Sequence, residues 1–251
     1  DYVPLEEGSD GTASKICTVV WSDNGIDGYD IIAEDSIVMN DGTEQWTALV
    51  KENTSFTFSL NIGAFYTGVP IVTANGVEIN GIEGQYNIII TEDTEINVSG
   101  IYEDESNISG TGTINDAYVV SRPIDLLYIA EQVNAGLGNY ASAAYILAND
   151  IDCKGEAISI IGTAENPFSG CFCCVSNIET GDIERHTISN FTITSMDKNC
   201  VGLFGYVQVD MSVEGSGLFY GICLDDFEII AGTTMLEENN RNLNCGGLIG
   251  Y

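Results

Sequence analysis

Between residues 15 and 102, apolar and polar residues alternate in short segments rich in Val, Ile, Thr, Phe and Tyr. A period of two is typical of strands that bury one face. Asn-Gly and Asp-Gly turns separate the segments, and Asn75-Gly76 is the clearest hairpin signal. We therefore expect an antiparallel, β-sandwich-like module over residues 15–102, with strands at 16–21, 30–39, 55–62, 70–79, 86–90 and 95–101.

The pattern changes on either side of this module. Residues 1–14 are polar and acidic without a period, which predicts a flexible acidic arm, and residues 103–114 are acidic and rich in Gly and Ser, which predicts a linker. Apolar residues at helical spacing then predict one helix at about 123–135. Pro123 suits its first turn, and Gly136 suits the position after its last turn.

The end of the chain repeats itself. VGLFGY at 201–206 recurs as GGLIGY at 246–251, 45 positions on, and NFTI at 190–193 recurs as DFEI at 226–229, 36 positions on. Self-similarity at this spacing predicts a β-solenoid, whose coils bury their apolar faces only by stacking. The glycines of the longer repeat are expected at coil corners, which require a positive φ or a close backbone approach: Gly202, Gly205, Gly247 and Gly250.

Five motifs occur in order across residues 115–251: DLLYIAEQVNAG, YILANDID, NPFSG, HTISN and VGLFGYV. Together they resemble bacterial cell-surface proteins with GLUG-type repeats. The resemblance implies a short right-handed parallel β-helix over 115–251, with the helix as its N-terminal cap, so the expected class is all-β. One departure is residues 171–185, where three cysteines and an insertion replace the Asp-Gly turn that is usual in that family.

The same resemblance implies an exported, adhesin-like protein of the cell surface or extracellular space. Such a protein would be no enzyme and would bind host or matrix glycans or proteins through a rigid solenoid. Two alternatives stay open: a β-helix enzyme that acts on polysaccharides, and a structural spacer of a larger surface protein. The chain begins with Asp1, so we expect a longer precursor from which a secretory signal has been removed.

The charge of the chain limits the classes of molecule that it could bind. The net charge is -31, with only four Lys and three Arg. Phosphate backbones and anionic lipids both require clustered positive side chains, so we expect no nucleic-acid partner. No stretch approaches the ~18 apolar residues of a membrane helix, so we expect no membrane insertion.

Two candidate sites rest on spacing. Asp23, Asp27 and Glu34 fall at positions 1, 5 and 12 of a partial calcium loop, although a plain acidic turn explains them as well. No other cofactor is expected. Cys200 and Cys245 precede the two copies of the hexapeptide, and neighbouring coils would bring them within reach of a disulfide. The alternative is a ladder of buried free thiols.

Other residue groups carry weaker signals. Cys171, Cys173 and Cys174 lack the paired spacing of zinc ligands, and Phe172 and Val175 beside them look like wall residues, which argues against a metal site. The carboxylate pairs Asp150/Asp152 and Asp226/Glu228 could serve glycoside chemistry, but 38 acids make such pairs common. His186 is expected at a turn. Phe65-Tyr66 is the aromatic pair that we expect to be exposed as a platform for sugars.

Overall fold

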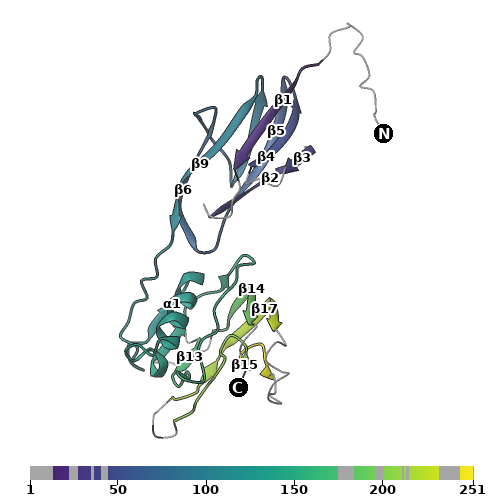
Figure 1. The fold of residues 1–251 in the computed structure, drawn as a ribbon. Coiled ribbons are helices and arrows are strands. Elements are labelled where there is room, and N and C mark those ends of the chain that lie inside the picture. The colour runs from purple at the N-terminus through teal and green to yellow at the C-terminus, as the bar shows by residue number, and fades with distance from the viewer. Residues whose placement is uncertain are drawn as a thin grey trace. The chain divides into compact units, whose positions relative to one another are not determined.

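The computed structural model describes residues 14–22, 28–34, 37–40, 45–174, 184–195, 200–210, 212, 215–231 and 244–250. The chain divides into two compact units, Asp1–Asp104 (unit 1) and Glu105–Tyr251 (unit 2). Strands far outnumber helices among the described residues, which agrees with the expected all-β class (Figure 1). Among the described residues, no helix is long and apolar enough to cross a membrane.

Unit 1 contains two sheets. One has the strand order β3-β4-β1-β9-β6-β7, and the other has the order β2-β5-β8. Neighbours are antiparallel except β1 and β9, which run parallel from Val19–Thr94 to Trp21–Ile96. The strands are β1 (Ile16–Ser22), β2 (Tyr29–Glu34), β3 (Ile37–Asn40), β4 (Gln45–Lys51), β5 (Thr54–Ile62), β6 (Tyr66–Ala74), β7 (Val77–Ile79), β8 (Gln85–Ile90) and β9 (Thr94–Glu103).

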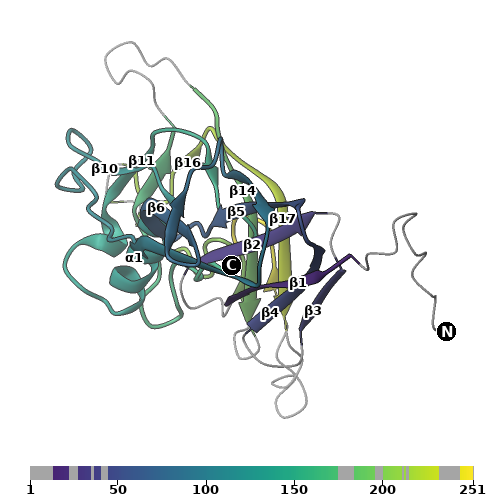
Figure 2. The ribbon, with the colours of Figure 1, turned by 90° about the horizontal axis from the view of Figure 1, so that it is seen from above.

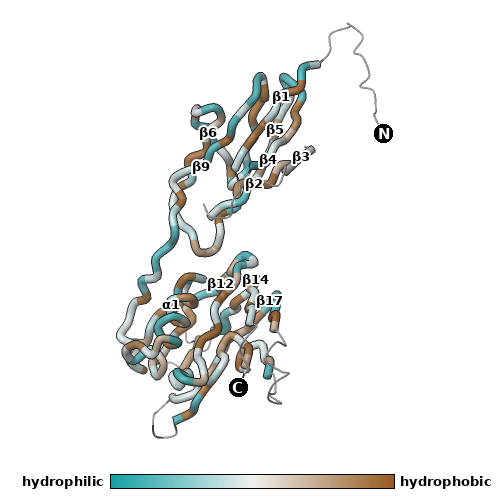
Figure 3. The backbone as a smooth tube through the Cα atoms, in the orientation of Figure 1, coloured by the Kyte–Doolittle hydropathy of each residue, from teal (hydrophilic) through white to brown (hydrophobic). Residues whose placement is uncertain are grey.

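The alternation in the sequence builds the core of unit 1. Every second residue of β5 is buried, at Phe56, Phe58 and Leu60, and Figure 3 shows apolar and polar positions alternating along this strand. Side chains from both sheets join one cluster, in which the Phe58 and Tyr86 rings stack 5.1 Å apart. Two sheets around a shared core agree with the expected sandwich-like module.

Three strand predictions for unit 1 can be compared with the structure. The Asn75-Gly76 hairpin is confirmed, because β6 and β7 pair antiparallel from Ala74–Val77. The single strand expected at 30–39 is wrong, since β2 and β3 belong to different sheets. Strand β4 was not predicted, although it pairs with both β1 and β3.

Unit 2 is built from small parallel sheets. The orders are β10-β11-β13-β16, β12-β14-β17 and β15-β18, and every pair is parallel. Figures 1 and 2 show β14 and β17 side by side. The elements are β10 (Tyr118–Val120), α1 (Pro123–Asn134), a 3-10 turn (Tyr140–Ser142), β11 (Ala144–Leu147), β12 (Ile151–Asp152), β13 (Cys171–Cys173), β14 (His186–Ser195), β15 (Cys200–Val201), β16 (Phe219–Tyr220), β17 (Ile222–Ala231) and β18 (Asn244–Cys245).

Helix α1 lies where the sequence predicts a helix, and its ends follow the expected rules. Pro123 is its first residue, and Gly136 adopts φ +66° directly after the cap. The buried Asp125 carboxylate accepts hydrogen bonds from the Arg122 N–H (3.0 Å) and the Ser106 hydroxyl (3.0 Å). Most of the linker predicted at 103–114 therefore belongs to unit 2, where Ser106 is hydrogen-bonded to the start of α1.

The sequence repeats of unit 2 correspond to its strand registers. Phe191 pairs with Phe227 in the β14–β17 ladder, at the predicted spacing of 36. Phe204 bridges Ile249 at the spacing of 45, but β15 and β18 pair one residue earlier, with Cys200 opposite Asn244. The period of 36 therefore matches the register of the long β14–β17 ladder throughout. The period of 45 matches the Phe204–Ile249 bridge but not the β15–β18 pair.

The four repeat glycines satisfy one of the two expected requirements. None of them has a positive φ. Instead, a Cβ on Gly202 would lie 2.5 Å from the Gly246 carbonyl oxygen, and one on Gly250 would lie 2.6 Å from the Val201 nitrogen. A Cβ on Gly205 would crowd the Ile160 side chain, and one on Gly247 would meet the Phe227 ring. These glycines therefore permit close packing between parallel segments.

Candidate functional site

An open groove of about 410 Å³ runs across three neighbouring segments of unit 2, and we call it the corner groove. The first segment follows β12, and the other two belong to β14 and β17, which are hydrogen-bonded to one another over nearly their whole length. The position of the groove is therefore set by a continuous parallel ladder. It is lined by Lys154, Gly155, Asn190, Phe191, Thr192, Asp226, Phe227 and Glu228.

Each of the three segments bends at one non-glycine residue with a left-handed backbone. The φ angles are +52° at Lys154, +54° at Asn190 and +44° at Asp226. This conformation is uncommon outside glycine, although Asn and Asp tolerate it better than other residues. Asn190 and Asp226 are level with each other, because the pairs Ser189–Asp225 and Phe191–Phe227 lie on either side of them. Strained backbone of this kind concentrates at functional sites.

Hydrogen bonds hold this corner in place. The Asp152 carboxylate accepts from the Lys154 N–H and from the Asn190 side-chain amide, both at 2.8 Å. The Asn190 amide and then the Lys154 N–H lower the pKa of Asp152 below its ordinary value of 3.8. The Gly155 N–H in turn donates to the Asn190 carbonyl oxygen at 2.6 Å. The Asn190 side chain and the backbone at Lys154 and Gly155 are therefore held in place before a ligand binds.

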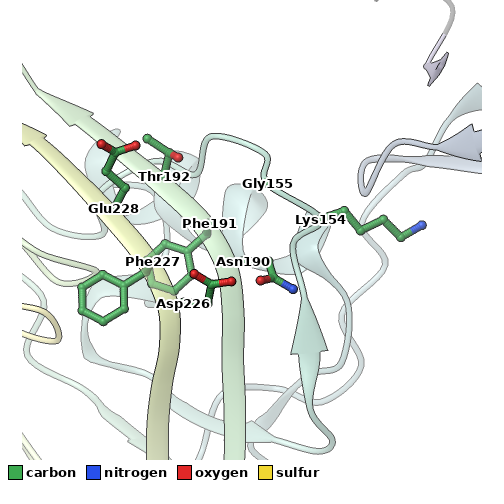
Figure 4. A pocket seen from close by; sticks show the side chains of 8 residues that line it. All are labelled: Lys154, Gly155, Asn190, Phe191, Thr192, Asp226, Phe227 and Glu228. Carbon is green, nitrogen blue, oxygen red and sulfur yellow. The ribbon is translucent and has the colours of Figure 1, made fainter. Parts of the chain in front are cut away.

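The side chains of the groove offer polar contacts to a ligand. In Figure 4, Asn190 and Asp226 lie next to each other, Thr192 and Glu228 lie together further along the strands, and Lys154 extends away from them. The Phe191 and Phe227 rings stack 5.3 Å apart, and Phe227 keeps 38% of its surface exposed. Carboxylates, a hydroxyl and an apolar ring edge match the hydroxyls and C–H faces of a carbohydrate.

The two predicted carboxylate pairs differ in their surroundings. Asp226 and Glu228 both line the corner groove and are exposed. Asp150 and Asp152 instead serve the backbone: Asp150 accepts from the Thr187 N–H at 2.8 Å, and its carboxylate lies 3.5 Å from Nδ1 of His186. The Asp150/Asp152 pair thus has the structural role that the sequence left open.

A second groove, of about 310 Å³, lies in unit 1. Tyr66, which the sequence marks as an exposed platform, is half-buried here and packs directly over Gly28. A Cβ on Gly28 would lie 2.1 Å from the Tyr66 ring, so glycine is required for this packing. We call this the tyrosine groove; it is lined by Tyr29, Tyr66, Val98, Ser99, Ile101, Tyr102 and Glu103.

The predicted calcium loop is only partly visible. Asp23 and Asp27 lie outside the described residues, and Glu34 is the last residue of β2, paired with Thr57. Within the described part of the chain, no group of three or more His, Cys, Asp or Glu side chains is arranged to hold a metal ion. That finding also covers Cys171, Cys173 and Cys174.

The predicted pairing of Cys200 with Cys245 is not formed. Both thiols are free, with Cys200 buried and Cys245 exposed. The one-residue shift of the β15–β18 register places Cys200 opposite Asn244. Because side chains alternate between the two faces of a strand, the shift directs the two sulfurs to different faces. Of these two cysteines, only Cys200 is therefore a buried free thiol, as the alternative to a disulfide predicted.

Comparisons with family models, with curated proteins and with solved structures give no match for this chain. The candidate sites therefore rest on the geometry above. Sequence reasoning found Asp226 and Glu228 but missed Lys154 and Asn190 as groove residues. One sequence signal could have indicated Asn190. It occupies the same position of the 36-residue repeat as Asp226, and both residue types tolerate a left-handed backbone.

Proposed function

We propose that the chain is an exported, adhesin-like binding protein of the cell surface that takes host or matrix glycans. In this proposal the parallel sheets of unit 2 form a short right-handed β-helix capped by α1, as the resemblance to GLUG-repeat proteins implies. The polar side chains along the corner groove bind the ligand, and no chemical step is involved.

The observation that supports this proposal best is the fixed geometry of the corner groove. Asn190 and Asp226 are held level by the β14–β17 ladder, and Asp152 orients the Asn190 amide. A site that is rigid before binding loses little conformational entropy when a ligand enters. Repeated polar positions along stacked segments also suit a ligand that itself repeats, such as a polysaccharide.

The test is a glycan array probed with the purified chain, followed by titration of any hit by calorimetry. We expect Asp226→Asn and Glu228→Gln each to weaken binding about tenfold, which corresponds to ~1.4 kcal/mol for one lost hydrogen bond to a charged group. Glu165→Gln is the matched control, because it removes the same charge from an exposed position outside the groove.

The outcomes separate the candidate functions. A hit that the groove variants and Glu165→Gln leave equally strong would place the binding surface elsewhere and count against the corner groove. A blank array at high protein concentration would favour a structural spacer. New reducing or unsaturated ends on the glycan would favour an enzyme that uses the exposed Asp226 and Glu228 carboxylates.

A further inference from the structure

The tyrosine groove of unit 1 differs from the corner groove in the side chains that line it. Three of its seven lining residues are tyrosines, Glu103 adds a carboxylate, and none of the seven carries a positive charge. The corner groove, by contrast, includes Lys154, and its two rings are phenylalanines. The tyrosine groove therefore combines electron-rich rings with negative charge, and its volume of about 310 Å³ suits a small molecule.

Two neighbouring strands carry most of these residues. Strands β6 and β9 run antiparallel, side by side in Figure 1, and their register places Tyr66 opposite Glu103, with Tyr102 one residue earlier on β9. Tyr29 is the first residue of β2, in the other sheet, and the Gly28 before it lies against the Tyr66 ring. Two tyrosines and the carboxylate therefore come from one ladder, and the third tyrosine comes from the second sheet.

A β-bulge shapes this end of the ladder. Between Gly68 and Ile71, β6 contributes two residues where β9 contributes only Gly100. Gly68 and Gly100 have φ angles of +122° and +80°, and a Cβ on Gly68 would lie 2.1 Å from the Gly100 carbonyl oxygen. Bulges bend a strand, re-aim its side chains and are over-represented next to active sites. The bulge therefore sets the direction of the strand ends that carry Tyr66 and Tyr102.

The three tyrosines differ in exposure. Tyr29 is buried, Tyr66 is half-buried, and Tyr102 keeps 63% of its surface exposed. A buried ring suits the floor of a site, where its position is fixed, and an exposed ring suits the rim, where a ligand can lie against it. Glu103 is exposed as well, next to Tyr102 in the chain.

We propose that the tyrosine groove binds a small quaternary ammonium ion, such as the trimethylammonium group of choline. The face of an aromatic ring attracts a cation that lies within about 6 Å of the ring centre. A quaternary ammonium ion has no N–H to donate, so ring faces suit it better than hydrogen-bond acceptors do. Glu103 adds coulombic attraction, and the net charge of -31 raises the concentration of cations around the chain. A neutral sugar would gain nothing from this charge.

The test titrates the full chain with choline chloride by calorimetry, in parallel with the uncharged isostere in which carbon replaces the nitrogen. Wild type should bind choline saturably and the isostere at least about tenfold more weakly, because the two molecules share a shape but not a charge. Competition between free choline and phosphatidylcholine vesicles then distinguishes a free cation from a lipid headgroup as the source of the same group.

Variants identify the groups that bind the cation. Tyr102→Ala should weaken choline binding about tenfold, whereas Tyr102→Phe, which keeps the ring face, should change it little. Glu103→Gln should weaken binding about threefold, and more at low salt than at high salt. Tyr220→Ala and Glu78→Gln are the matched controls, since both remove exposed side chains that do not line the groove.

A measurement on wild type covers variants that fold poorly. Nuclear Overhauser effects should connect the choline methyl protons with ring protons of Tyr102. Equal affinity for choline and its isostere, an equal loss of binding in the two control variants, or no saturable binding would overturn the proposal. Asp226→Asn should leave choline binding unchanged, so this site and the glycan site in the corner groove can fail independently.

Discussion

The two units build their sheets by different routes. In unit 1 the strands are mostly antiparallel and two sheets share one core. In unit 2 every strand pair is parallel, and partners such as Phe191 and Phe227 lie 36 positions apart. Parallel neighbours require a long connection between them, whereas antiparallel neighbours can be joined by a two-residue turn. In unit 1, local turn residues therefore indicate which strands pair. In unit 2, the spacing of the sequence repeats indicates it.

Two glycines, one in each unit, meet different requirements. In the β6–β7 hairpin, Gly76 has φ +79° and open space around the position of a Cβ, so its use there is conformational. In unit 2, Gly202 has no positive φ, but its Cβ would collide with the backbone of the paired segment. Gly76 thus meets a requirement of backbone geometry, whereas Gly202 meets a requirement of space.

The largest expected effect comes from removing one core ring from each unit. Phe58 is fully buried in unit 1, and Phe204 is fully buried in unit 2. Phe58→Ala and Phe204→Ala should each lower the free energy of unfolding of their own unit by about 3–5 kcal/mol. Because Trp21 and Trp46 both lie in unit 1, tryptophan fluorescence during denaturant unfolding reports on that unit, and circular dichroism reports on both.

If the units unfold independently, Phe204→Ala should leave the fluorescence midpoint in place and shift only part of the dichroism curve. An equal shift of both signals in that variant would show that the two units unfold as one cooperative body, and the comparison between them would then be one of architecture alone.

A smaller effect separates the two uses of glycine. Gly202→Ala should destabilise unit 2 by about 1–3 kcal/mol, because the paired backbone must move. Gly76→Ala should cost unit 1 about 1 kcal/mol through its left-handed backbone, and Gly76→Asn should cost less, since Asn tolerates that conformation. Thermal unfolding of the four variants, with Gly202→Asn as the fourth, checks this; relief by Asn at position 202 would contradict the steric explanation.

The smallest expected effect is one of pH. The Asn190 side chain lowers the pKa of Asp152 in unit 2, whereas the Thr18 N–H, at 2.8 Å, is the main cause of the lowered pKa of Asp93 in unit 1. A depressed carboxyl pKa stabilises the folded state above the unfolded pKa of about 3.9, and the benefit is lost as pH falls through the folded value.

Asn190→Ala should therefore raise the pKa of Asp152 toward 3.8, so that unit 2 is less stable near neutral pH and loses less of its stability on acidification. Thr18→Val should move Asp93 less, because the backbone donor remains. Carboxyl chemical shifts measured against pH by NMR give both values directly. An unchanged Asp152 titration in Asn190→Ala would mean that the Lys154 N–H alone holds this carboxylate.

Much of the fold could be predicted because short sequence patterns determine it. The Asn75-Gly76 turn and helix α1 with Gly136 follow local rules, and the 36-residue repeat matches the β14–β17 register. The assignment of β2 and β3 to different sheets could not be predicted, since hairpin signals identify neighbours but not sheet membership. The parallel β1–β9 pair joins residues about 75 positions apart with no repeat between them, so no pattern marks it.

The candidate sites were less predictable than the fold. Asp226 and Glu228 could be found from their alternation, but the groove also depends on the left-handed backbone of Lys154, a residue type that does not favour this conformation.

The parallel pairing of β1 with β9 has a mechanical consequence. These are the first and last strands of unit 1, and they are bonded through the pairs Val19–Thr94, Val20–Glu95 and Trp21–Ile96. When a chain is pulled from both ends, parallel terminal strands slide along each other, so the tension loads their hydrogen bonds in shear. Bonds loaded in shear must break together, whereas bonds at the end of a hairpin open one after another. Unit 1 is thereby built to resist tension along the chain.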